Sequence, residues 1–150
     1  MGDGLEITRR RLPHWQMTGS TYFVTWRLAL GQPDFIEPER DLIASALKHF
    51  QHERYRLYCY VMMNDHIHCL VEPKQGRPLR EILHSWKSFA AHALVKQHRR
   101  VPPVWLDESY DRIIRDEAEL MEKAQYIVTN PHRRWPGWHD YRWVEWFSFD

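Results

Sequence analysis

Hydrophobic residues follow two different periods along the chain. Four runs dense in β-branched and aromatic residues predict strands, at residues 21–28, 55–63, 66–72 and 110–115. Three segments with apolar residues three and four apart predict helices, at residues 38–53, 78–98 and 117–130. Phe89 belongs to the predicted buried stripe of the second helix, and Asp116 is the predicted N-cap of the third. The predicted buried stripe of the third helix consists of Leu120, Ala124, Ile127 and Val128. Asn64 and Asp65 have turn chemistry, so we expect the second and third strands to form a hairpin.

The elements follow one another as strand, helix, strand, strand, helix, strand, helix. The first six match the ferredoxin-like, split-βαβ arrangement. We therefore predict an α+β fold in which two helices cover one face of an antiparallel sheet. The last helix would cover the other face.

Length and composition favour one domain over residues 1–150, because 43% of the residues are apolar and can form a substantial core. The first segment, 1–11, is a basic arm that ends in three arginines. The tail, 132–150, is rich in Trp, Tyr and Arg but has no clear period, so the sequence assigns no helix or strand to it.

Several classes of protein are disfavoured. No apolar run is long enough for a membrane helix, and the first residues lack a secretory signal, so we expect a cytoplasmic protein with no membrane partner. Cys59 and Cys69 have no metal-binding spacing and are expected to be reduced. Net charge is only +1, but residues 74–100 hold seven Lys or Arg against one acid, which favours a local basic face.

The third predicted strand carries two histidines, His66 and His68, with Ile67 between them. Strand side chains alternate, so both imidazoles project from one face and form half of a metal site. Two packed or surface histidines are the simpler interpretation of such a pair. A two-residue turn places residue 60 opposite 69 and residue 61 opposite 68. In this register Cys69 lies on the opposite face from the histidines and from Cys59, which excludes a disulfide.

The last predicted helix places Tyr126 and Asn130 four residues apart, so the phenol and the carboxamide project together. Both lie opposite the apolar stripe of that helix. A tyrosine in this position is, by itself, typical of an ordinary amphipathic helix. The six motifs described next give Tyr126 a different interpretation.

Six segments occur in the order seen in the REP-associated tyrosine transposases, which belong to the HUH superfamily. They are Leu12-Pro-His-Trp, Tyr22-Phe-Val-Thr-Trp-Arg-Leu28, Asn64-Asp-His-Ile-His68, Trp86-Lys-Ser-Phe89, Tyr110-Asp-Arg-Ile-Ile-Arg-Asp116 and Tyr126-Ile-Val-Thr-Asn-Pro131. The chain resembles this family over roughly residues 9 to 146. It departs from many relatives in having Asn64-Asp65 instead of Pro-Asn, and His132 instead of Val.

The resemblance implies a metal-dependent endonuclease and strand transferase that acts on single-stranded DNA near hairpins formed by REP-type palindromes. His66 and His68 would bind Mg²⁺ or Mn²⁺, with Asn130 as a third ligand. Tyr126 would attack the phosphodiester and form a 5′-phosphotyrosine. The resemblance also implies a bacterial, nucleoid-associated protein, and a monomer is favoured over a dimer.

We expect DNA contacts from basic side chains and from the segment around Trp15. The candidates are Arg9, Arg10, Arg11, His14, Trp15, Arg80, Lys87, Arg112, Arg115, Arg133 and Arg134. Two other functions fit parts of the pattern. One is a non-catalytic protein of the same ancestry that binds structured DNA. The other is an RNA-binding module of the RRM type, which has the same order of elements.

Overall fold

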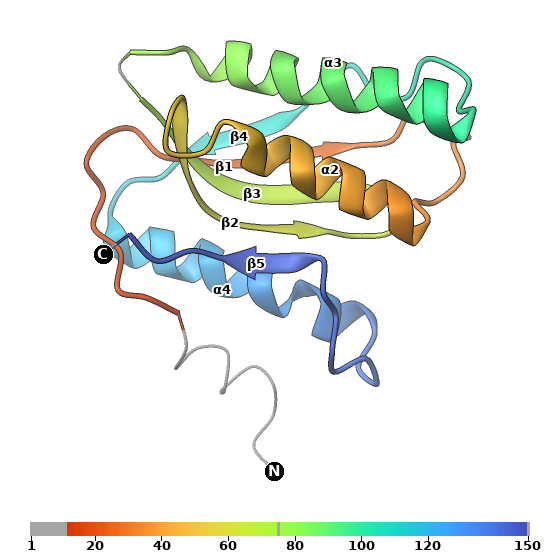
Figure 1. The fold of residues 1–150 in the computed structure, drawn as a ribbon. Coiled ribbons are helices and arrows are strands. Elements are labelled where there is room, and N and C mark those ends of the chain that lie inside the picture. Colours follow the sequence, from red (N-terminus) through yellow and green to blue (C-terminus); the bar gives the residue numbers. More distant parts are fainter. Residues whose placement is uncertain (1–11, 75, 150) are drawn as a thin grey trace.

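The computed structural model describes residues 12–74 and 76–149. A five-stranded antiparallel sheet in the order β4-β1-β3-β2-β5 forms its centre (Figure 1). The strands are β1 (Tyr22–Arg27), β2 (Tyr55–Met62), β3 (His66–Pro73), β4 (Tyr110–Ile113) and β5 (Val144–Trp146). The helices are α2 (Glu37–His49), α3 (Leu79–His98) and α4 (Glu117–Arg134).

The helices form two layers, one on each side of the sheet. Figure 1 shows α2 and α3 on one face and α4 on the other. The predicted α+β fold is thus confirmed, including the position of the last helix over the histidine face. None of the described helices is long and apolar enough to span a membrane.

The register of the β2–β3 hairpin is the predicted one. Tyr60 pairs with Cys69 and Val61 pairs with His68. A bulge between Leu57 and Cys59 lies further along the hairpin. Both cysteines are buried and free, as the register required.

Each layer of the core is built from one face of the sheet. On the α2 and α3 side, Trp26 stacks on Trp86 with ring centroids 5.8 Å apart. Tyr55 accepts a hydrogen bond from the Trp86 indole at 2.9 Å. On the other side, α4 buries the predicted stripe of Leu120, Ala124, Ile127 and Val128. Burying one of the larger side chains of this stripe, such as Leu120 or Ile127, stabilises the fold by about 1.5–3 kcal/mol.

Two sequence predictions about the helices are wrong. Phe89 was expected in the buried stripe of α3 but is 60% exposed, because α2 and α3 leave a groove of about 170 Å³ between them at this level. The last helix was expected to stop near Asn130 but continues to Arg134 through Pro131. Proline costs α4 one N–H donor. The helix nevertheless continues, since Pro131 is buried and its carbonyl accepts the Trp135 N–H at 2.7 Å.

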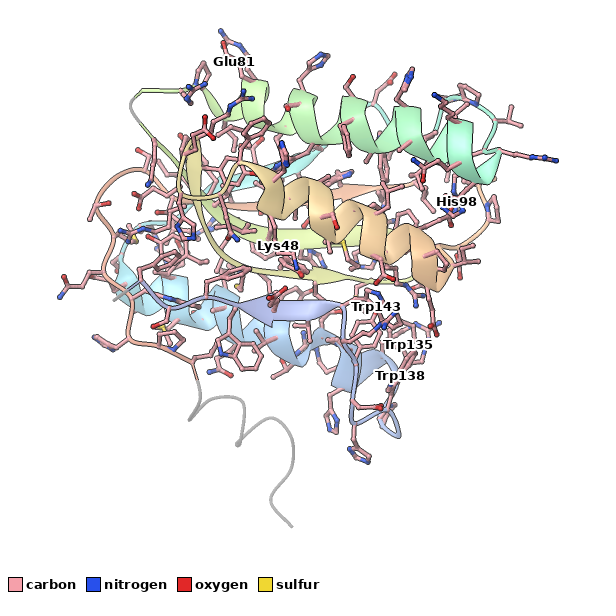
Figure 2. The ribbon with its side chains drawn as sticks, in the orientation of Figure 1. Lys48, Glu81, His98, Trp135, Trp138 and Trp143 are labelled. Atoms are coloured by element: carbon pink, nitrogen blue, oxygen red, sulfur yellow. The ribbon has the colours of Figure 1, made fainter. Side chains whose placement is uncertain are left out.

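The tail, to which the sequence assigned no helix or strand, completes the sheet. β5 pairs with the outer edge of β2, with Cys59 opposite Trp146 and Val61 opposite Val144. The turn before it contains a cluster of aromatic rings, Trp135, Trp138, Tyr141 and Trp143, near the end of α4 (Figure 2). Aromatic packing and one edge pairing therefore fix this segment.

A buried ion pair fixes the end of α3 against the start of α2. Arg100 donates to both carboxylate oxygens of Glu39, at 2.6 and 2.7 Å, and to the carbonyl oxygens of Pro33 and Asp34. Burial favours the neutral acid, but the hydrogen bonds from Arg100 hold the pKa of Glu39 below its ordinary value. Both side chains are less than 5% exposed.

We expect Arg100→Ala to lower the free energy of unfolding by about 3–5 kcal/mol, because the Glu39 carboxylate would remain buried without its partner. Urea denaturation measures this change. Arg142→Ala is the control, since Arg142 forms an exposed pair with Asp41 and its loss should cost about 0–1 kcal/mol. If Arg100→Ala and Arg142→Ala lowered the free energy of unfolding equally, the structural role of the buried pair would be contradicted.

Candidate active site

The two histidines lie at the start of β3, directly after the tight turn at residues 64 and 65. Their ring centroids are 4.7 Å apart and their planes are inclined at 77°. Ile67 between them is completely buried on the opposite face. His68 is also buried, whereas His66 is partly exposed. The pair therefore lies at the boundary between the core and solvent, as a ligand-binding pair would.

The Nδ1 atom of each ring is engaged by a neighbouring side chain. His66 Nδ1 donates to Asp65 Oδ1 at 2.7 Å. His68 Nδ1 lies 2.6 Å from Thr25 Oγ1 on the adjacent strand β1. When Nδ1 of a histidine donates to such a partner, the Nε2 lone pair is left to bind a metal. The arrangement orients both rings and therefore fits a metal site.

His68 is held in its neutral form. Burial, followed by the nearby His66, Arg27 and Arg133, lowers the pKa of His68 to about 3. A histidine must be neutral to coordinate a metal ion. His68 would therefore need no deprotonation before it bound a metal near neutral pH.

Tyr126 stands over this pair from α4. Its ring centroid lies 5.4 Å from that of His68 and 6.0 Å from that of Phe23, and both contacts are edge-on. The Arg133 guanidinium lies 4.7 Å from the Tyr126 ring centroid and donates to the Tyr126 carbonyl at 2.7 Å. Tyr126 is nevertheless 45% exposed. Its ring is thus held in place and is still accessible to a large substrate.

The first turn of α4 is fixed to the edge of the sheet. Asp116 accepts the Glu119 N–H at 2.8 Å, as the predicted N-cap required. Glu119 in turn accepts from the Arg115 N–H at 2.8 Å and from Arg112 on β4 at 2.6 Å. The Arg112 hydrogen bond, together with the Arg115 N–H, lowers the pKa of Glu119 to about 2. These contacts determine where α4, and therefore Tyr126, lies over the histidines.

Asn130, the predicted third ligand, lies one turn after Tyr126 on α4 and is partly buried. Within residues 12–74 and 76–149, no group of three His, Cys, Asp or Glu side chains is arranged to hold a metal. An amide oxygen such as that of Asn130 remains the predicted complement to the two histidines.

Three of the predicted DNA-binding cations are engaged in contacts within the protein. Arg112 and Arg115 both pair with Glu119. Lys87 donates to Ser109 Oγ at 3.1 Å, and burial lowers its pKa. These side chains hold the segment that leads into β4 and α4, so each has a structural role.

The other predicted DNA contacts are scattered. Arg133 lies beside Tyr126, and Arg134 lies 5.2 Å from the Trp135 ring centroid. Arg80 is exposed on α3, which is on the far side of the sheet from Tyr126. His14 is exposed. The predicted contacts at Arg9, Arg10 and Arg11 lie outside the described residues.

Trp15 is not placed to stack on a base. It is 3% exposed, packs edge-on against Tyr58, and donates its indole N–H to the Phe147 carbonyl at 2.8 Å. This is the core role that most tryptophans have. The ring joins the N-terminal segment to the chain that follows β5.

Four site residues were not singled out in the sequence: Phe23, Thr25, Arg27 and Asp65. The first three alternate along β1, and the register places them beside Leu70, His68 and His66. Arg27 is half exposed and lies 4.0 Å from Asp65. Side chains alternate between the two faces along β1, and this could have placed Phe23, Thr25 and Arg27 on one face. Their position beside the histidines, however, follows only from the pairing of β1 with β3.

No family model matches the chain, and no curated protein matches it. Solved structures do. One is a REP-associated tyrosine transposase bound to a REP hairpin, with 18% identity, a TM-score of 0.70, and coverage of 88% of this chain and 79% of that one. Another is a Deinococcus radiodurans protein assigned as a transposase, with 12% identity, a TM-score of 0.56, and coverage of 74% and 92%. The predicted resemblance to REP-associated tyrosine transposases is confirmed at the level of the fold.

The low pKa of Glu119 predicts how the anchoring of α4 depends on pH. In the folded protein the pKa of Glu119 lies below its ordinary value of 4.5. The ionised Glu119 carboxylate therefore stabilises the fold fully above about pH 4.5, and this contribution is lost as the pH falls towards 2. We expect parent and Glu119→Gln proteins to differ in unfolding free energy near neutral pH and to converge in acid. Urea unfolding at a series of pH values measures this.

The control for this experiment is Glu117→Gln, which removes an exposed carboxylate from the same helical turn. It should remain close to the parent in stability. If the difference in unfolding free energy between the parent and Glu119→Gln stayed the same at acid pH, the carboxylate charge would not be what anchors α4.

Proposed function

We propose that this protein is a metal-dependent single-stranded DNA endonuclease and strand transferase that acts beside hairpin DNA. The observation that carries the proposal is the exposed Tyr126 ring, 5.4 Å from the ring of His68, over a pair of oriented histidines. The fold supports it, because a protein of similar fold is a tyrosine transposase bound to a REP hairpin.

His66 and His68 would hold the metal through Nε2, with Asn130 as the further ligand, and the ion would be Mg²⁺ or Mn²⁺. Bound there, such an ion would act as a Lewis acid on a phosphate oxygen and contribute several kcal/mol to the stabilisation of the transition state. Asp65 and Thr25 would keep the two rings in the ligating orientation.

Tyr126 would be the nucleophile. Its Oη forms a bond to phosphorus while the bond from phosphorus to the 3′-oxygen breaks, and the phenolic proton leaves during the attack. The products are a 5′-phosphotyrosine and a strand with a free 3′-hydroxyl. Because the covalent bond retains the phosphodiester energy, a second 3′-hydroxyl can attack it and rejoin strands without ATP.

Arg133 and Arg27 bring positive charge close to His68, and Arg133 lies beside Tyr126 itself. Phosphoryl transfer increases negative charge on the phosphate oxygens, and fixed cations at that position stabilise it. Arg133 also holds the Tyr126 backbone and ring, so it orients the nucleophile as well. Arg27 extends the positive potential across β1, since it pairs with His66 in the register.

The RNA-binding interpretation has less support. An RRM-type module stacks bases on the aromatic residues of a free sheet face. Here α4 covers that face, and Phe23 at its centre is only 6% exposed. A non-catalytic DNA-binding protein would have the same fold. Whether Tyr126 reacts with DNA is therefore what separates that interpretation from the proposed nuclease.

We expect Tyr126→Phe to abolish covalent adduct formation and to retain DNA binding, because only the attacking oxygen is lost. Protein mixed with labelled hairpin DNA carrying single-stranded flanks, in Mn²⁺ or Mg²⁺, is resolved on a denaturing gel. Tyr22→Phe makes the same chemical change away from the site and should form the adduct. Tight binding without any adduct, across a library of hairpins, would favour the non-catalytic protein.

Metal binding is tested through the histidines and Thr25. His68→Ala should abolish Mn²⁺ binding measured by calorimetry, whereas His92→Ala, on the exposed side of α3, should not. Thr25→Val removes the Nδ1 partner of His68 and should weaken Mn²⁺ binding about 10–100-fold. Thr25→Ser keeps the hydroxyl group and should bind Mn²⁺ as tightly as the parent protein. Unchanged affinity in both His66→Ala and His68→Ala would refute the metal site.

A further inference from the structure

A row of directly paired residues leads from the histidines to the open edge of the sheet. His68 on β3 pairs with Thr25 on β1, and Thr25 pairs with Tyr110 on β4. Directly opposed residues of antiparallel strands project from the same face. Tyr110 therefore lies on the face that holds His68 and Tyr126, and β4 is the last strand on that side.

Tyr110 is exposed and supported from beneath. It is 57% exposed, and its ring packs edge-on against Phe23 with centroids 6.3 Å apart. Phe23 is buried and also contacts the rings of Tyr126 and His68, at 6.0 and 5.5 Å. One buried ring thus contacts both exposed tyrosines. Tyr110 presents an aromatic surface to solvent next to the candidate nucleophile.

The polar groups next to this surface include a cation suited to phosphate. Arg27 lies on β1 two residues from Thr25 on the same face, and its side chain is 50% exposed. Asp65 Oδ1 lies 4.0 Å from Arg27 Nη2, which is too far for a hydrogen bond, so this contact does not use up the donors of the guanidinium. Tyr110 and Arg27 are therefore diagonal neighbours on one face of β4 and β1, since Tyr110 is opposite Thr25. An aromatic ring and an arginine in this arrangement match the two parts of a single-stranded nucleotide, since bases stack on aromatic rings and phosphates pair with cations.

We propose that Tyr110 and Arg27 form a nucleotide subsite at the β4 edge, next to the scissile phosphate. The base of a flanking nucleotide stacks on Tyr110, and its phosphate pairs with Arg27. The occupant is single-stranded DNA, so this proposal rests on the proposed function. The subsite holds the strand across the edge of the sheet and aligns the phosphate with Tyr126.

Tyr110 is tested by fluorescence in a Tyr126→Phe background, which binds DNA without cutting it. The probes are hairpins in which single positions of the flanks carry 2-aminopurine, whose emission is quenched by stacking. We expect one flank position close to the cut to be quenched on binding. Tyr110→Leu should remove this quenching and weaken binding about tenfold. Tyr110→Phe should retain both.

Arg27 is tested by the salt dependence of the same binding reaction. Arg27→Gln should reduce the slope of log affinity against log salt by about 0.7, the value for one phosphate contact on a single strand. Tyr110→Leu should leave this slope unchanged, because stacking releases no counterions. An unchanged slope in Arg27→Gln would remove Arg27 from the subsite.

The outcomes separate this proposal from the proposed function. If the parent protein forms the Tyr126 adduct but quenching survives in Tyr110→Leu at every flank position, the subsite is refuted and the chemistry stands. Failure to bind single-stranded DNA would refute both. If Tyr110→Leu changes the sedimentation coefficient of the free protein, the edge of β4 is a contact between two copies of the chain, and the subsite is again refuted.

Discussion

The register of β3 is the constraint on which the candidate site depends. A shift of one residue would turn His66 and His68 into the α2 and α3 layer and bring Ile67 to the site face. Pairing with β1 on one side and β2 on the other prevents such a shift. The turn is fixed as well, because the Asp65 carbonyl accepts the Leu28 N–H at 2.9 Å and the Asn64 carbonyl accepts the Phe35 N–H at 2.7 Å.

The site is assembled from two parts that are fixed by different forces. Backbone pairing positions the histidines and Thr25, whereas side-chain contacts position Tyr126. α4 lies over the sheet through its apolar stripe, and the hydrogen bonds of Glu119 to Arg112 and to the Arg115 N–H fix its first turn. The half that carries the histidines should therefore be the more rigid of the two, since every residue of β3 pairs with a neighbouring strand.

The sequence predicted the elements whose pattern is local. The β2–β3 register follows from a two-residue turn, and the stripe of α4 follows from helical spacing. β5 escaped prediction because three residues at an edge have no detectable period. Arg112 was predicted as a DNA contact from its charge alone, and its ion pair with Glu119 is identified only when β4 and α4 are placed in space. The continuation of α4 through Pro131 likewise depends on tertiary packing, which overrides the local preference of proline.

The hydrogen bond from Trp15 to Phe147 joins residues 132 positions apart. During synthesis from the N-terminus, the Trp15 indole therefore lacks this acceptor until the segment after β5 has left the ribosome. The outer edge of β2 is uncovered for the same period. A nascent chain that stalls in the tail would thus expose an unpaired strand edge and a large apolar ring together, a combination that chaperones and other nascent chains recognise.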